Sequence, residues 1–225
     1  MVWTHPFTML VAGPSASGKS TFVARVLENL DTLIPDTKFD RIVWCSGSDY
    51  RPSLQRPVIT TFQHGVPTDI HEVATGRPCL VVLDDLMQDA YQDKSVSDLF
   101  SKMSHHNNVS VILITQNIFH QGRQARDISL NCKYFVLVKN PRDQKQFGVL
   151  ARQMWPSRWR DVEEVYKDAT REPHSYLVID CAQDTNDCLR LQTDIFADDH
   201  VCTVYVPDVN RYLVYDAGTE TYSVQ

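Results

Sequence analysis

Short apolar runs alternate along the chain with segments of helical periodicity. The runs over 79–83 and 109–115 are almost wholly apolar, which is typical of strands covered on both faces of a sheet. The predicted strands are 7–12, 41–45, 79–83, 109–115 and 134–138, with weaker candidates at 58–62, 176–179 and 189–196. The predicted helices are 21–33, 96–103 and 144–154. Strands that alternate with helices indicate a layered α/β fold.

The alternation ends near residue 196, which sets the expected domain boundary. With 225 residues, 43% of them hydrophobic, the chain is long and apolar enough to bury one large core. We expect one domain over 1–196 and a C-terminal extension over 197–225. Within the extension, 205–215 is predicted to form a β-hairpin that packs on the core.

Several sequence patterns indicate the cellular compartment in which the protein is expected. No apolar run approaches the roughly 18 to 20 residues of a membrane span, so no span is predicted. The N-terminus has no basic start followed by an apolar stretch, so no secretory signal is expected. The six cysteines stand singly, without Cys-x-x-Cys pairs, which argues against a zinc site and favours an intracellular, reducing compartment.

Charge is distributed unevenly along the chain. The net charge of −6 argues against a histone-like binder of polyanions. Residues 1–120 carry a net −3, residues 121–160 carry +7, and residues 161–225 carry −10. The basic block is either a local surface for a polyanion or a solvated face that meets the acidic C-terminal part.

A phosphate-binding motif follows the first predicted strand. Residues 13–20 match Gly-x-x-x-x-Gly-Lys-[Ser/Thr], and a predicted helix follows. The nucleotide-binding residues we expect are Gly13, Pro14, Ser15, Ala16, Ser17, Gly18, Lys19, Ser20 and Thr21. In such a loop the backbone amides and the helix N-terminus point at phosphate oxygens, the lysine reaches the β- and γ-phosphates, and the serine hydroxyl binds Mg²⁺. The alternative is an ordinary glycine turn before a helix.

Two carboxylates, Asp84 and Asp85, stand directly after the apolar run 79–83. The carboxyl ends of strands in α/β sheets are where ligands bind. We expect Asp84 to hold the Mg²⁺ ion and Asp85 to act as general base toward the attacking water. The alternative is that both aspartates cap the turn or helix that follows.

Polar amides, Gln116 and Asn117, follow the run 109–115. An amide at a strand end beside the γ-phosphate can orient the attacking water or respond to phosphate loss. Gln116 is the first choice for this role and Asn117 the second. The alternative is a turn-forming Gln-Asn pair.

Three segments carry a family resemblance. They are Gly-Pro-Ser-Ala-Ser-Gly-Lys-Ser-Thr at 13–21, Val-Val-Leu-Asp-Asp at 81–85 and His-His-Asn-Asn-Val-Ser-Val-Ile-Leu-Ile-Thr-Gln-Asn at 105–117. Together they resemble the FtsK–HerA superfamily of ring-forming ATPases, and in particular the DNA-packaging ATPases of large DNA viruses and of Maverick/Polinton-type elements. Segments 121–131, 139–143 and 194–196 also look similar to the second group, so the resemblance covers residues 6–196.

The resemblance implies a RecA-like P-loop NTPase fold of the additional-strand class. Such a fold has a mainly parallel sheet with helices on both faces, and a C-terminal β extension would be added here. It further implies ATP hydrolysis with Mg²⁺, a homo-oligomeric ring and double-stranded DNA as a partner that is bound without sequence preference. Capsid vertex proteins are a further implied partner, and the implied location is a viral assembly site or the host nucleus or cytoplasm. One departure concerns Asp85, because many members of the family have glutamate there, which is one methylene longer.

The resemblance also suggests a role for arginines. Ring ATPases commonly insert an arginine from a neighbouring subunit against the γ-phosphate, and Arg123 and Arg126 are the candidates here. The alternative for both is a surface ion pair or a DNA contact. The other basic residues of 121–160 either line a DNA path or form a solvated helix face.

Two other functions use the same loop. A small-molecule kinase would use Arg123 and Arg126 as a lid over the nucleotide, although adjacent carboxylates favour activation of water. A catalytically weak ATP-binding scaffold would result if the shorter Asp85 did not reach the water.

Overall fold

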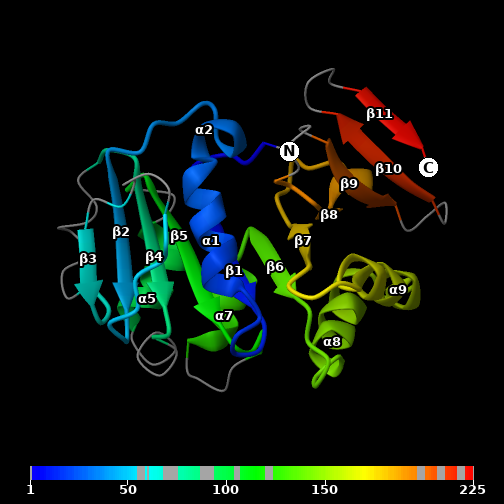
Figure 1. The fold of residues 1–225 in the computed structure, drawn as a ribbon, viewed down its shortest axis with the longest axis horizontal. Helices are drawn as coiled ribbons and strands as arrows, with labels where there is room; N and C mark the ends of the chain where they lie inside the picture. Colours follow the sequence, from blue (N-terminus) through cyan, green and yellow to red (C-terminus); the bar gives the residue numbers. More distant parts are fainter. Residues whose placement is uncertain are drawn as a thin grey trace. The chain divides into compact units, whose positions relative to one another are not determined.

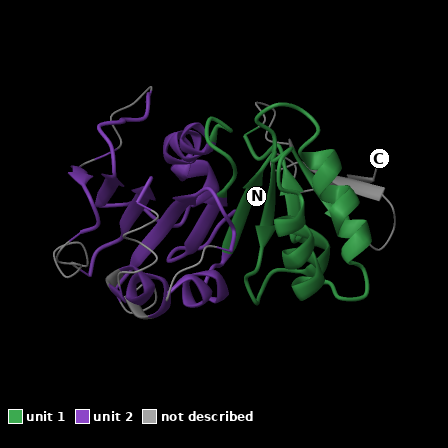
Figure 2. Cartoon of the chain, turned by 90° about the horizontal axis from the view of Figure 1, so that it is seen from below, with its two compact units in different colours: residues 1, 12–18, 134–225 green, residues 2–11, 19–133 purple. Residues whose placement is uncertain are grey.

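The structure, a computed structural model, describes most of the chain. The described residues are 2–54, 59, 61–67, 76–86, 94–103, 107–119, 124–196, 201–206, 211–216 and 221–224. The chain divides into two compact units: unit 1 comprises residues 1, 12–18 and 134–225, and unit 2 comprises residues 2–11 and 19–133 (Figure 2).

Unit 2 is built on neighbouring strands in the order β1-β5-β4-β2-β3 (Figure 1). Their bounds are β1 (Thr8–Ala12, whose last residue belongs to unit 1), β2 (Arg41–Ser46), β3 (Thr61–His64), β4 (Cys79–Asp84) and β5 (Val109–Thr115). β2 pairs in parallel with β3 and with β4, and β4 pairs in parallel with β5. The position of β5 between β1 and β4 is the arrangement that defines the additional-strand class.

The central strands of unit 2 are completely covered. Every residue of β1, β4 and β5 is buried, which explains why these segments read as continuous apolar runs. The helical elements of this unit are α1 (Lys19–Glu28), α2 (Leu30–Leu33), α5 (Lys94–Asp98), the π-helix η1 (Leu99–Met103) and α7 (Ala125–Leu130). Figure 2 shows helices on both faces of the unit 2 sheet.

Unit 1 contains a second group of strands, in the order β6-β7-β8-β9-β10-β11, and every pair whose register is described is antiparallel. Their bounds are β6 (Tyr134–Val138), β7 (Tyr176–Asp180), β8 (Leu191–Thr193), β9 (Val201–Val206), β10 (Arg211–Asp216) and β11 (Thr221–Val224). The helices are α8 (Lys145–Met154) and α9 (Trp159–Ala169), with the 3-10 turn η2 (Asp187–Leu189) before β8. α8 and α9 pack against each other, and α9 also contacts β7.

The α/β fold class is confirmed, with the parallel part of the sheet in unit 2. The predicted strands 109–115 and 134–138 match β5 and β6 to the residue, and the weak candidate at 58–62 corresponds to β3, which begins at Thr61. The candidate at 189–196 is shorter than expected, because η2 occupies its start. No helix in the described ranges is long and apolar enough to cross a membrane.

The helices differ more from the expectation than the strands do. The helix predicted over 21–33 is broken at Asn29, whose side-chain and backbone amides share the Arg25 carbonyl as acceptor, at 2.7 and 3.1 Å. The predicted helix 96–103 changes to π geometry at Leu99. The sequence did not predict α7 and α9, because their buried stripes are narrow. Only Val162, Tyr166 and Ala169 are buried on α9.

The C-terminal extension continues the sheet of unit 1 strand by strand. The hairpin predicted over 205–215 corresponds to β9 and β10, which are longer than expected, and β11 adds a third antiparallel strand. Since β9 pairs with β8, the extension adds to the edge of this sheet. The domain boundary between 196 and 197 stays a prediction.

Tyr166 attaches α9 to the rest of unit 1 through a hydrogen bond and a ring contact. The Tyr166 hydroxyl donates to the Val138 carbonyl at 3.2 Å, and its ring stacks on Phe147 of α8 with the ring centroids 4.3 Å apart. Burial of the Tyr166 side chain raises the pKa of its hydroxyl, so this group stays a proton donor.

We expect Tyr166→Phe to lower the free energy of unfolding by about 1 kcal/mol, the usual net worth of a buried hydrogen bond. For a chain of this length that corresponds to a fall of roughly 2–4 °C in Tm. Thermal unfolding followed by circular dichroism measures the change. Lys167→Gln is the control on the same helix, because the exposed ion pair between Lys167 and Glu164 contributes little to the free energy of unfolding. Equal Tm values for Tyr166→Phe and the control would contradict the assignment.

Candidate functional site

The first part of the phosphate loop is a tight turn in unit 1. The Ser17 amide donates to the Pro14 carbonyl at 3.3 Å, and both Ala16 and Gly18 adopt positive φ, at 59° and 94°. A turn in which left-handed residues alternate with others directs successive amides to the same side, and this makes a concave anion site. The Ser17 hydroxyl is buried and has no hydrogen-bond partner among the described residues.

The two glycines of the motif are required for different reasons. A Cβ at Gly13 would lie 3.0 Å from the Ser17 hydroxyl and 3.1 Å from Val138 Cβ, so a side chain there would crowd the turn against β6. Gly18 has the positive φ that other residues rarely adopt, and a Cβ there would lie 3.4 Å from the imidazole of His174.

Unit 2 begins again at Lys19, where α1 starts directly after the loop. Lys19 and Ser20 form the first turn of this ten-residue helix and are half-buried. The unpaired amides and the dipole of a helix N-terminus favour an anion at this position.

The Ser20 hydroxyl donates to Asp84 Oδ2 at 3.1 Å. Asp84 is the last residue of β4 and is only 6% exposed. The hydrogen bond joins residues 64 positions apart and brings the serine of the motif to the first aspartate. The shared role of these two residues as Mg²⁺ ligands stays a prediction.

Burial and charge oppose each other at this site. Burial raises the pKa of Asp84, and the hydrogen bond from Ser20 partly offsets this effect. Burial likewise lowers the pKa of Lys19, while the carboxylates of Asp84 and Asp85 raise it. A buried carboxylate and a buried ammonium each cost free energy that their mutual attraction recovers only in part.

Asp85 differs from Asp84 in exposure and backbone conformation. Its side chain is exposed and its φ is 54°, in the left-handed region. Gly47 at the end of β2 packs on this turn: its amide donates to the Asp84 carbonyl at 3.1 Å, and a Cβ there would lie 2.4 Å from the Asp85 carbonyl oxygen. The turn therefore directs the second carboxylate toward solvent.

Gln116 and Asn117 follow β5 and are exposed. β4 and β5 run in parallel with Leu83 opposite Leu113, so Gln116 and the two aspartates lie at the same edge of the sheet. The backbone amide of Asn117 donates to the Thr115 hydroxyl at 3.3 Å, and this hydrogen bond shapes the turn at the end of β5. The role of Gln116 stays a prediction.

The candidate arginines are not brought to the site by the described contacts. Arg123 lies outside the described residues. Arg126 lies on α7 with an exposed side chain. Both stay candidates for an arginine that acts on a neighbouring subunit.

Sequence reasoning missed two residues near the predicted site residues. Tyr50 is close enough to Asp84 for the carboxylate to add to the burial effect that raises the tyrosine's pKa. His174, at φ 63° in the turn between α9 and β7, places its imidazole against Gly18. No local pattern in the sequence pointed to either residue.

The oxygens of Ser20 and Asp84 are suited to a magnesium ion. Ligands about 2.0–2.1 Å from Mg²⁺ in octahedral geometry lie about 3 Å from each other, and these two oxygens are 3.1 Å apart. Among the described residues no group of three or more His, Cys, Asp or Glu side chains converges on one point. Mg²⁺ does not require one, because it usually keeps several waters and phosphate oxygens as ligands.

Comparison with known proteins identifies the fold. No family model matches the chain, and no curated protein matches it. The genome packaging NTPase B204 from Sulfolobus turreted icosahedral virus 2, in complex with ATP-gammaS, aligns over 84% of this chain and 96% of its own, with a TM-score of 0.55 and 11% identity. The chain has a P-loop NTPase fold. The cytoplasmic domain of the type VII secretion ATPase EccC from Thermomonospora curvata aligns over 79% of this chain and 24% of its own, with a TM-score of 0.46 and 12% identity.

We expect Asp84→Asn to raise the stability of the protein at neutral pH. Because the folded-state pKa of Asp84 is raised, the charged carboxylate destabilises the fold above that pKa, and this cost disappears below the ordinary value of 3.8. Asparagine keeps an oxygen for Ser20 without the charge, so Tm at pH 7 should rise by roughly 2–4 °C, equivalent to about 1 kcal/mol.

Differential scanning calorimetry at several pH values measures this effect. The gain should be largest near pH 7 and should shrink as the pH falls toward 3.8. The exposed Asp36→Asn serves as the control and should leave Tm unchanged. A Tm at pH 7 equal to or below that of the wild type would contradict the destabilising role of the buried charge.

Proposed function

We propose that the protein is a Mg²⁺-dependent ATPase that drives double-stranded DNA into a viral capsid. The hydrogen bond between Ser20 and Asp84 carries the proposal, because it unites the end of the phosphate motif with the carboxylate that follows β4. B204, described as a genome packaging NTPase in complex with ATP-gammaS, supports the proposal through its shared fold.

In the proposed mechanism the loop from Gly13 to Thr21 binds the triphosphate through its backbone amides and the Lys19 ammonium. Ser20 and Asp84 would hold the Mg²⁺ ion, which supplies positive charge to the β- and γ-phosphates when bound.

The hydrolytic step follows from the remaining groups at this sheet edge. A water oxygen attacks the γ-phosphorus, the bond from that phosphorus to the ADP oxygen breaks, and the water proton passes to the Asp85 carboxylate. Gln116 orients the water, with Asn117 as the second candidate. Asp85 is exposed, so a water molecule can reach its carboxylate.

The assembly that we propose is a homo-oligomeric ring with Arg123 or Arg126 of each subunit acting on the neighbouring site. Capsid vertex proteins are proposed as further partners. The six cysteines, all of them in the described residues, form no disulfide. The compartment that we propose is a reducing one, at a viral assembly site or in the host nucleus or cytoplasm.

ATP hydrolysis measured as phosphate release, without any acceptor molecule, tests the enzymatic part. We expect Lys19→Ala to lose at least about 100-fold in kcat/KM. An ammonium at the transferring phosphate is among the largest contributions to stabilisation of the transition state. Asp85→Asn should lose kcat by about 10²–10⁴-fold, as removal of a general base does, while still binding ATPγS.

Lys167→Ala, which changes an exposed lysine of α9, is the matched control and should hydrolyse ATP like the wild type. If phosphate is transferred only to an added small molecule and not to water, the alternative function as a small-molecule kinase is favoured. Tight ATPγS binding by a wild type that shows no turnover, with or without DNA, would favour the scaffold.

The same assay with double-stranded DNA tests the motor. We expect DNA to stimulate hydrolysis, and the apparent DNA affinity to fall steeply with salt, since phosphate contacts release counterions. Arg142 is an exposed residue of the basic block, and Arg142→Gln should reduce the slope of log K against log[salt] by about 0.9 if it contacts one DNA phosphate. Turnover that neither DNA nor salt changes would count against translocation.

A further inference from the structure

A cavity of about 580 Å³ opens in unit 1 beyond the end of β7. Val138, which lies against Gly13 of the phosphate loop, pairs with Tyr176 at the start of β7. The cavity begins at Cys181, directly after the last residue of the same strand. Five strand residues, roughly 15 Å, therefore separate it from the phosphate loop. Its volume falls within the ~300–1,000 Å³ of ordinary small-molecule sites.

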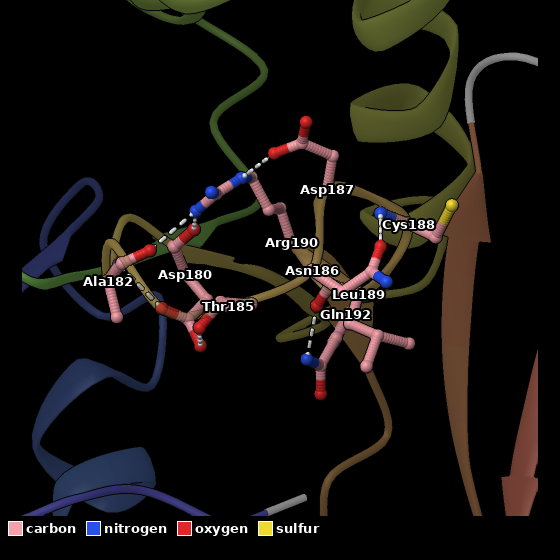
Figure 3. A network of polar contacts seen from close by, with 9 residues as sticks. All are labelled: Asp180, Ala182, Thr185, Asn186, Asp187, Cys188, Leu189, Arg190 and Gln192. Carbon is pink, nitrogen blue, oxygen red and sulfur yellow. Dashed lines mark hydrogen bonds and ion pairs between the residues drawn. The ribbon is translucent and has the colours of Figure 1, made fainter.

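One wall of the cavity is a fixed arginine, Arg190. Its Nε donates to Asp187 Oδ1 at 2.7 Å, and its Nη1 donates to the carbonyls of Ala182 at 2.8 Å and Asp180 at 3.1 Å (Figure 3). The Asp180 carboxylate in turn accepts from the Ala182 amide and the Thr185 hydroxyl, both at 2.8 Å. A guanidinium held in this way loses little further conformational freedom when a ligand binds.

The charged groups of the wall favour an anion. Arg158 and Arg190 line the cavity, and Asp187 is the one carboxylate in its described lining. The Nε of Arg158 also donates to Asp161 Oδ2 at 3.3 Å, next to the cavity. The Asp187 side chain is 90% exposed, whereas that of Arg190 is only 18% exposed, so solvent screens the carboxylate more than the guanidinium. Burial raises the pKa of the Cys181 thiol to about 12, which keeps this neighbour uncharged at neutral pH.

The apolar part of the wall includes an aromatic ring, that of Trp155. Two tryptophans flank the turn between α8 and α9, and their surroundings differ. Arg152 and Arg160 lie over the ring of Trp159, at 3.8 and 4.7 Å from its centroid. The Trp155 side chain lines the cavity beside Met154 and has no hydrogen bond or ring contact with the described residues. A planar ring could stack on it without displacing another group.

We propose that this cavity is a second ligand site, which binds a small aromatic molecule with a carboxylate or phosphate group. The ring would pack on Trp155 and Met154, and the anionic group would lie between Arg158 and Arg190. The proposal does not depend on the proposed ATPase function, because every residue involved lies away from the phosphate loop.

Isothermal titration calorimetry with 1-naphthyl phosphate tests the proposal. The full-length Lys19→Ala chain is titrated so that the phosphate loop is impaired, and the wild type is titrated with ATPγS and Mg²⁺ in excess. We expect saturable binding of one molecule per chain in both. Inorganic phosphate and uncharged 1-naphthol should bind at least about tenfold more weakly, because each lacks one of the two recognition elements. A parallel titration with 1-naphthoate shows which anionic group the arginines prefer.

Two variants locate the binding. Trp155→Ala and Arg158→Gln should each raise the Kd by about tenfold, the usual effect of losing a stacked ring or a charge-assisted hydrogen bond. Arg160→Gln is the matched control, since Arg160 lies in the first turn of α9, over the ring of Trp159 and outside the cavity lining, and it should leave the Kd unchanged. Circular dichroism checks that each variant is folded.

Four results would overturn the proposal. They are the absence of saturable binding in both titrations, equal binding of 1-naphthol, a Kd unaffected by Trp155→Ala and Arg158→Gln in folded protein, and binding that excess ATPγS abolishes. The last of these would place the ligand at the phosphate loop. None of them bears on ATP hydrolysis by the wild type, so the two proposals fail separately.

Discussion

The hydrogen bond from Ser20 to Asp84 is the contact on which the candidate site depends. It links the first turn of α1 to the end of β4, and both positions are fixed by their own elements. β4 is buried along its whole length, so its last carboxylate is delivered into a poorly solvated position. The serine and the nearby lysine are the groups that offset the cost of that burial. A bound cation would add to the same compensation, and a bound anion would offset the burial of the Lys19 ammonium.

The two aspartates illustrate how one strand end produces two environments. Asp84 continues the extended backbone and is buried, while Asp85 turns into the left-handed region and is exposed. The close approach of Gly47 to the Asp85 carbonyl keeps the turn in this form. Buried charge and left-handed backbone both reduce stability, and such features persist where a function selects for them.

Helix α9 extends from the cavity in unit 1 toward the phosphate-loop turn of the same unit. It begins after Arg158, which lines the cavity, and near its end Tyr166 holds the carbonyl of Val138, the residue that packs on Gly13. Its stacked contact with Phe147 makes α8 and α9 a pair. The phosphate-loop turn and the distal cavity are therefore built on the same short set of packed elements.

The sequence by itself determined the strands, the phosphate motif and the carboxylates after β4. These depend on local patterns: continuous apolar runs for strands buried on both faces, and glycines where φ is positive. The helices 21–33 and 96–103 were less well determined, because the Asn29 side chain and a π turn changed them locally. The narrow apolar stripe of α9 gave too little periodicity to detect. Only the tertiary structure decided that Ser20 meets Asp84, that His174 lies against Gly18, and that Trp155, Arg158 and Arg190 surround one cavity. Contacts between residues far apart in the chain are set by how strands pair and helices pack, and no local pattern encodes them.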